Sequence, residues 1–172
     1  MPLAGSVLGF ARRVFSTQVA YAHCDIPCGI YDPHMAQLAA LNTIRMNQLI
    51  AGLATPGHTA TPQEQAAYAA AISRYVSVKE EHAELCKKEL RVLWGDYFRP
   101  EHLQQHPGLH EQFFNAMKLA SKVRQNNDLK AAQDLLAAVQ GIAEIFWQTK
   151  GAKVSRQPSR QGAAGGELVY PA

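Results

Sequence analysis

Apolar residues recur every three or four positions along most of the chain, a spacing that predicts helices rather than strands. A first helix is expected over residues 33–52, because Asp32 is a good N-cap and Pro33 suits the first helical position. A second, longer helix should begin at Thr61-Pro62-Gln63-Glu64, which has the form of a capping box, and end near Gly95.

Two further helices follow a connector at residues 96–108, which Pro100 and Pro107 interrupt. The third is expected over residues 109–123, and the fourth runs from an N-cap at Asp128 to about residue 150. The expected inward positions are Met35, Leu38, Leu41, Ile44 and Leu49, then Tyr68, Ile72, Tyr75, Val76, Leu90 and Leu93, then Leu109, Phe113, Met117, Ala120 and Val123, and finally Ala132, Leu135, Val139, Ile142 and Phe146.

Four amphipathic helices with short connections predict an all-α protein, an antiparallel four-helix bundle over residues 33–150. Residues 151–172 are rich in Gly, Ser and Pro and have few apolar positions, so we expect a disordered, mobile tail. No apolar run reaches the roughly 18 residues that a transmembrane helix needs, so no membrane partner is expected.

Charge excludes one class of partner. The formal net charge is +3, and without Arg12 and Arg13 it falls to 15 minus 14, or +1. No basic stripe with interleaved aromatic residues is present in the sequence, so nucleic acid is not an expected partner.

Residues 1–22 contain no acidic residue and end in Ala20-Tyr21-Ala22, a small-x-small pattern typical of processing sites. The arginines lie in the middle of this segment rather than before an apolar stretch, which disfavours a conventional secretory signal. We therefore expect a leader that a protease removes. The cytoplasm is the default compartment, with organellar targeting by the leader as the alternative.

The stretch His23-Cys24-Asp25-Ile26-Pro27-Cys28 crowds soft metal ligands into an irregular segment ahead of the first helix, and residues 23–32 are expected to form a compact hook. The third cysteine, Cys86, is distant in sequence, and three cysteines make a poor disulfide framework. A zinc site would need a second ligand pair, which the sequence does not offer.

Cleavage before His23 would create a new ligand. The liberated α-amine, the backbone amide nitrogen of Cys24 and the thiolates of Cys24 and Cys28 make two nitrogens and two sulfurs, with the His23 imidazole available above their plane. Tetragonal sets of this kind favour nickel or copper over zinc. The leader and the ligands thus explain one another, since an uncleaved chain has no free amine at this position.

"HCDIPCGIYDP", together with "LWGDYFRPEHL" and "IFWQTK", resembles nickel-containing superoxide dismutase over most of residues 23–150. The resemblance implies a nickel cofactor held by His23, Cys24 and Cys28, which cycles between its divalent and trivalent states while superoxide becomes dioxygen and hydrogen peroxide. It also implies a homohexamer.

The same resemblance gives Tyr31 a gating and hydrogen-bonding role at the open face of the metal, and Tyr97 a supporting role behind it. In the best-known members a glutamate and an arginine brace the axial imidazole, but the matching positions here are Ala39 and His82. His82 or a water molecule could take the place of that pair.

Two other function classes compete with the enzyme. A non-catalytic nickel or copper binding protein would use the same donors without turnover. A thiol–disulfide protein would cycle Cys24 and Cys28, although their spacing is not the usual C-x-x-C.

Overall fold

The computed structural model describes residues 29–172, and within this range the chain is largely helical. The long helices are α2 (His34–Ala51), α3 (Pro62–Val92), α5 (Leu109–Gln125) and α6 (Leu129–Thr149). Short helices η1 (Leu93–Tyr97) and α4 (Pro100–Gln105) connect α3 to α5. The chain ends with strand β1 (Val154–Pro158), the 3-10 turn η2 (Gly162–Ala164) and strand β2 (Glu167–Pro171).

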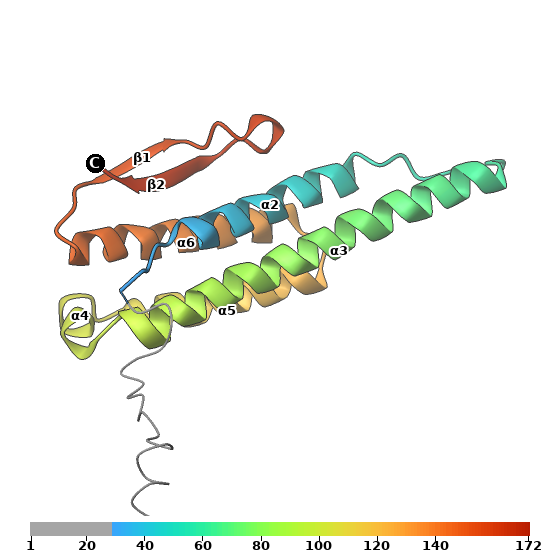
Figure 1. Ribbon diagram of the computed structural model, residues 1–172. Coiled ribbons are helices and arrows are strands. Elements are labelled where there is room, and N and C mark those ends of the chain that lie inside the picture. The colour runs from blue at the N-terminus through green and yellow to red at the C-terminus, as the bar shows by residue number, and fades with distance from the viewer. Residues whose placement is uncertain (1–28) are drawn as a thin grey trace, which may run out of the picture.

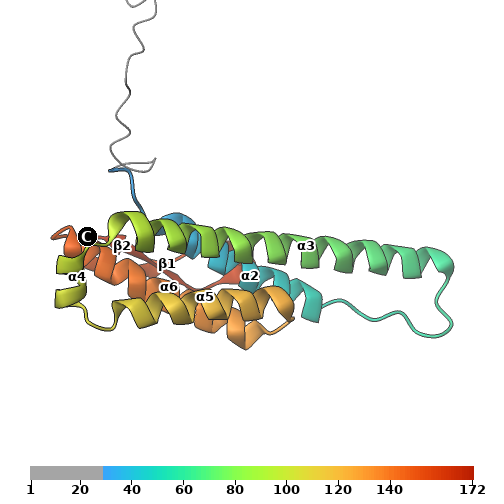
Figure 2. The same cartoon turned by 90° about the horizontal axis from the view of Figure 1, so that it is seen from below.

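The four long helices form the predicted antiparallel bundle. Helix α2 packs against α3 and α6, and α5 packs against the same two helices, which closes a ring of four. Consecutive helices run in opposite directions, and α3 extends well beyond the others (Figures 1 and 2). None of the helices between residues 29 and 172 has a stretch long and apolar enough to cross a membrane.

The predicted caps explain where α3 and α6 begin, whereas α2 begins one residue later than expected. Its N-cap is Pro33 rather than the predicted Asp32, and Asp32, one residue before that cap, accepts a hydrogen bond from the backbone N–H of His34 (2.7 Å). At the start of α3, Glu64 N–H donates to Thr61 Oγ1 (3.3 Å) and Thr61 N–H donates to Glu64 Oε2 (2.7 Å). Asp128 caps α6 by accepting from Ala131 N–H (2.9 Å).

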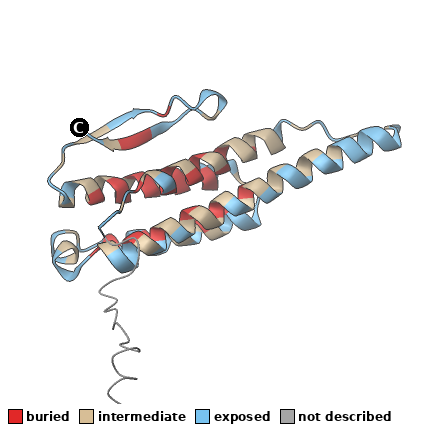
Figure 3. Ribbon diagram, viewed as in Figure 1, coloured by how far each residue is buried: buried red, intermediate tan, exposed pale blue. Residues whose placement is uncertain are grey.

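The core lies between the four helices and is made mostly of the predicted inward residues (Figure 3). Leu38, Leu49 and Met117 are only partly buried, and two further sets of positions also differ from the prediction. Met35 is 49% exposed, because it faces away from the bundle. The four early positions of the second helix, Tyr68, Ile72, Tyr75 and Val76, are only partly buried.

The length of α3 explains the second difference. Helix α3 has 31 residues and α2 has 18, so at about 1.5 Å per residue the first half of α3 projects past its neighbours. Among the described residues of α3, the first buried one is Lys79, whose Nζ donates to Asn126 O and Asn127 Oδ1, both at 2.7 Å. Periodicity predicted the apolar face of this helix but not how much of it a neighbouring helix covers.

The prediction of a mobile tail at residues 151–172 is corrected by the structure. Strands β1 and β2 pair antiparallel, from Val154 opposite Pro171 to Pro158 opposite Glu167. The resulting hairpin lies on the outside of α2 and α6, on the side away from α3 and α5 (Figure 1). Leu168 and Val169 are buried, so two adjacent apolar residues outweigh a composition that favours disorder.

Candidate metal centre

The predicted metal ligands His23, Cys24 and Cys28 lie outside the described residues, which begin at Gly29. Gly29 has φ of 77°, in the left-handed region that glycine enters without steric cost. We call residues 29–33 the hook root, because they join the predicted hook to α2. The hook root lies at the end of the bundle where α3 and α6 finish (Figure 1).

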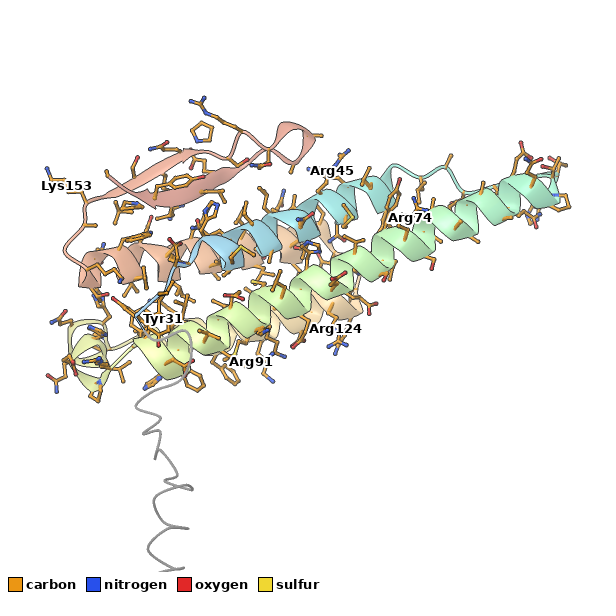
Figure 4. The ribbon with its side chains drawn as sticks, viewed as in Figure 1. Tyr31, Arg45, Arg74, Arg91, Arg124 and Lys153 are labelled. Atoms are coloured by element: carbon orange, nitrogen blue, oxygen red, sulfur yellow. The ribbon has the colours of Figure 1, made fainter. Side chains whose placement is uncertain are left out.

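Tyr31 in the hook root lies against Tyr97, with ring centroids 5.6 Å apart. Both line a cavity of about 320 Å³ at this end of the bundle, together with Gly29, Asp96, Arg99, Glu101, His102 and Lys150. Figure 4 shows Tyr31 where the chain enters α2, close to the last turns of α3. The two tyrosines predicted to belong to one site are therefore in contact.

A π-helical turn places Tyr97. Residues 93–97 follow α3 with wider turns, and Phe98 N–H donates to Leu93 O (3.1 Å), five residues back. Such turns are rare and occur often at functional sites. Tyr97 packs on Phe98 and on Phe146 of α6, with centroids 5.0 and 4.5 Å away, so its ring is held from two sides.

The hydroxyl of Tyr97 has a defined direction. It lies 2.7 Å from Thr149 Oγ1, and Thr149 Oγ1 donates its own proton to Phe146 O, also at 2.7 Å. A threonine hydroxyl has one proton, so the Tyr97 hydroxyl must be the donor in its contact with Thr149. Tyr97 therefore directs its proton toward α6 and keeps its oxygen lone pairs as acceptors.

A lysine and a histidine pack on the Tyr97 ring. Lys150 Nζ lies 5.3 Å from the Tyr97 ring centroid and 5.2 Å from that of Phe146, within the range of a cation–π contact. The His102 ring stacks on Tyr97 at 5.7 Å, and its Nδ1 accepts from Arg99 N–H (3.2 Å). That hydrogen bond places the ring proton of neutral His102 on Nε2.

Comparison with known proteins identifies the family. The model of the nickel-containing superoxide dismutase family matches residues 18–150 of this chain. The chain belongs to the nickel-containing superoxide dismutases. The match begins before the hook and ends at the last residue of the cavity, Lys150, so it includes every residue of the predicted site.

Individual relatives agree with the family match. The superoxide dismutase [Ni] of Streptomyces coelicolor is 36% identical over 141 residues, which cover 81% of this chain and 98% of the relative. The superoxide dismutase [Ni] of Streptomyces seoulensis is 35% identical over 141 residues, which also cover 81% of this chain and 98% of the relative. A solved native nickel superoxide dismutase superposes with a TM-score of 0.63 at 34% identity, covering 74% of this chain and 99% of its own.

The donors of this nickel-containing superoxide dismutase chain fit the metal. Two thiolates and an imidazole stand at the start of the hook, cleavage before His23 would add a terminal amine, and soft sulfur with nitrogen suits nickel. The described part of the chain contributes the tyrosines and the cavity. Within residues 29–172 no cluster of three His, Cys, Asp or Glu side chains could hold a metal.

The two positions that match the family's imidazole-bracing pair have different environments. Ala39 is 1% exposed on α2 and has no polar side chain. His82 lines a different, surface cavity on α3 with Glu81, Leu85 and Arg91, and its Nδ1 lies 2.9 Å from Val78 O. Within the described chain, His82 therefore does not share the cavity of Tyr31 and Tyr97.

Other histidine and cysteine candidates do not form a second site. Cys86 is fully buried, and burial raises the pKa of its thiol to about 12, so it remains protonated beside His82. His102 belongs to the tyrosine cavity, while His110 accepts a hydrogen bond from Trp94 Nε1 (2.8 Å).

Sequence reasoning missed three residues of the site. Thr149 and Lys150 belong to the quoted segment "IFWQTK", but helical periodicity gives no reason to single out polar residues at a helix end. His102 lies in the connector expected at residues 96–108, and the structure makes it both a cap of α4 and a wall of the cavity. The π-helical turn has no signal in the apolar pattern.

Proposed function

We propose that this chain is a superoxide dismutase that converts superoxide to dioxygen and hydrogen peroxide with nickel bound at its N-terminal hook. The observation that carries the proposal is the His23-Cys24-x-x-x-Cys28 donor set, within a family match that extends to the tyrosine cavity. The α-amine and imidazole of His23, the amide nitrogen and thiolate of Cys24, and the thiolate of Cys28 would hold the ion. Nickel in this electron-rich set supplies the one-electron couple that both half-reactions need.

Tyr31 and Tyr97 limit access and order water. Tyr31 extends from the hook root into a cavity that admits small molecules, and the Tyr97 ring supports it from behind. Because Tyr97 donates its proton to Thr149, its oxygen is available to other groups only as an acceptor. The protons of the peroxide product therefore come from solvent, ordered by these hydroxyls.

Maturation precedes activity in this proposal. A protease removes residues 1–22, and His23 becomes the N-terminal residue with a free amine. The Ala20-Tyr21-Ala22 pattern supports the cleavage position. We place the mature enzyme in the cytoplasm, with an organelle as the alternative destination.

A homohexamer is the proposed assembly. It rests on the family resemblance and on the position of the hook root at one open end of the bundle, where a neighbouring subunit could cover the hook. Light scattering on the matured, nickel-loaded protein measures the mass directly, and a monomer would contradict this part of the proposal.

The decisive experiment extends the mature chain by one residue before His23. The extra residue turns the amine into an amide, so we expect loss of dismutase activity, measured by pulse radiolysis, with the helical circular dichroism unchanged. Cys24→Ser and Cys28→Ser should give the same result, and Cys86→Ala is the matched control because Cys86 is buried away from the site.

Full activity of the extended protein would exclude the amine as a ligand. Tight nickel binding by the mature chain without turnover would instead favour the non-catalytic metal-binding protein. Mass spectrometry of the purified protein establishes which residue is N-terminal in each case.

A further inference from the structure

The C-terminal hairpin, residues 154–171, lies beyond the family match, which ends at Lys150. The superposition with the solved native nickel superoxide dismutase uses 74% of this chain and already covers 99% of that protein. The hairpin is thus an addition to the part of the chain that the family shares. Its position on α2 and α6 raises the question of what it does for the site at their ends (Figure 1).

One side chain of α2 binds the hairpin backbone. Gln37 is fully buried, its Nε2 donates to Val169 O (3.0 Å), and its Oε1 accepts from Val169 N–H (2.7 Å). The amide therefore satisfies both outward backbone groups of Val169, as an adjacent strand would. Since the pair is buried, loss of the amide would leave two unsatisfied groups in the core.

Helix α6 binds the same strand from the other side. Gln140, 6% exposed, donates through Nε2 to Glu167 O (2.6 Å). Arg156 of β1 pairs with Glu144 (2.6 Å). Strand β2 therefore bridges α2 and α6 by two buried glutamines, one on each helix.

Close packing completes the bridge. Gly166 has φ of 77°, and a Cβ built there would lie 3.4 Å from Leu41 of α2 and 3.6 Å from Leu136 of α6. The turn before β2 thus fits into the groove between the two helices. The separation of α2 and α6 cannot change without disturbing this contact or the glutamine hydrogen bonds.

The α2 end of the bridge lies next to the hook root. Gln37 is in the first turn of α2, three residues after His34, whose ring lies 5.7 Å from that of Tyr170. The hook root with Tyr31 directly precedes this turn. Helix α6 ends at Thr149, which accepts the hydrogen bond of Tyr97.

We propose that the hairpin holds the start of α2 against α6 and so keeps Tyr31 of the hook root in contact with Tyr97, with Gln37 and Gln140 as positioning residues. The effect on nickel rests on the proposed function. The effect on the tyrosine contact does not, because it concerns the described chain alone.

The test uses three Gln→Leu variants of the full chain, which change shape little but remove the amide. Gln37→Leu removes the α2 contact, Gln140→Leu removes the α6 contact, and Gln133→Leu on the exposed face of α6 is the matched control. Ring-to-ring nuclear Overhauser effects between Tyr31 and Tyr97 are measured in the metal-free protein. Release of nickel to a chelator is measured in the matured protein.

Gln37→Leu and Gln140→Leu should each weaken the Tyr31–Tyr97 signal. Gln37→Leu should also speed nickel release about tenfold, because it removes the two hydrogen bonds between Gln37 and Val169. The double variant should add little to either single one, because a bridge fails when one end is released. The control should match the wild type. Gln37→Asn, which keeps an amide on a shorter side chain, replaces Gln37→Leu if that variant loses its helical circular dichroism.

An unchanged tyrosine signal in folded Gln37→Leu and Gln140→Leu proteins would overturn the proposal. Independent, additive effects of the two variants would also overturn it, because they would indicate local destabilisation rather than a bridge. If the wild type binds no nickel, the proposed function fails, and the tyrosine signal in the metal-free protein still decides whether the hairpin holds the contact.

Discussion

Thr149 determines the direction of the hydrogen bond that Tyr97 makes. Its proton is committed to Phe146 O, so its oxygen is an acceptor for the Tyr97 hydroxyl. Without that acceptor Tyr97 could direct its proton into the cavity. Thr149 is thus a positioning residue for Tyr97. It lies at a helix end, where the spacing of apolar residues does not identify functional polar residues.

Thr149→Val keeps the shape of the side chain and removes the hydroxyl. We expect the dismutase rate to fall about fivefold, as for the loss of one net hydrogen bond. Thr149→Ser keeps the hydroxyl and should retain most of the rate. Pulse radiolysis of both variants beside Tyr97→Phe checks this, and a Thr149→Val rate equal to wild type would show that the direction of the Tyr97 proton is irrelevant.

Cys86 differs chemically from the two hook cysteines. It is fully buried on α3, and burial raises the pKa of its thiol to about 12. The thiolate is the reactive form, so at pH 8 a thiol reagent should modify Cys86 about a thousandfold more slowly than an exposed cysteine. In reduced, metal-free protein we expect two thiols to react promptly and the third only in denaturant, and prompt reaction of all three would contradict the buried position.

Among the helices, α6 depends on a charged cap. The backbone N–H of Ala131 is the main cause that lowers the pKa of Asp128, and Lys122, 2.9 Å away, adds to it. A carboxyl with a lowered folded-state pKa stabilises the protein fully above its ordinary pKa of about 3.9, and loses that contribution as the pH falls through the folded value.

The Asp128→Asn variant retains a capping oxygen but lacks the charge. Its melting temperature should be lower than that of the wild type at pH 6, and the difference should shrink as the pH falls below about 3.9. Calorimetry across this range provides the measurement. Glu101→Gln is a matched control at an exposed carboxyl, and a difference that does not change with pH would argue against the charge of Asp128.

At the scale of the whole molecule, the hairpin joins the bundle core. Leu168 is fully buried although it belongs to a segment whose composition is typical of disorder. Leu168→Ala should therefore lower the free energy of unfolding by about 2–5 kcal/mol, as a core leucine does. Leu129→Ala, at a position that is 37% exposed, should have a much smaller effect. Denaturant unfolding measures both, and equal small effects would mean that the hairpin is not part of the cooperative core.

The sequence by itself determined the four long helices and the caps of α3 and α6, and it predicted the chemistry of the hook. Helix ends follow from local rules, so Thr61 with Glu64 and Asp128 were identified without a fold. The hook donors lie within six residues, so their order alone indicated nickel or copper, and the family match agrees with nickel.

Only the tertiary structure decided which residues meet across the chain. Tyr31 and Tyr97 are far apart in sequence, and their contact depends on how α2, η1 and α6 pack. The hairpin is ordered because Gln37 and Gln140, distant residues on two helices, satisfy backbone groups of β2 that local sequence leaves unpaired. Composition describes a segment in isolation, whereas burial and hydrogen bonding depend on the surface against which that segment packs.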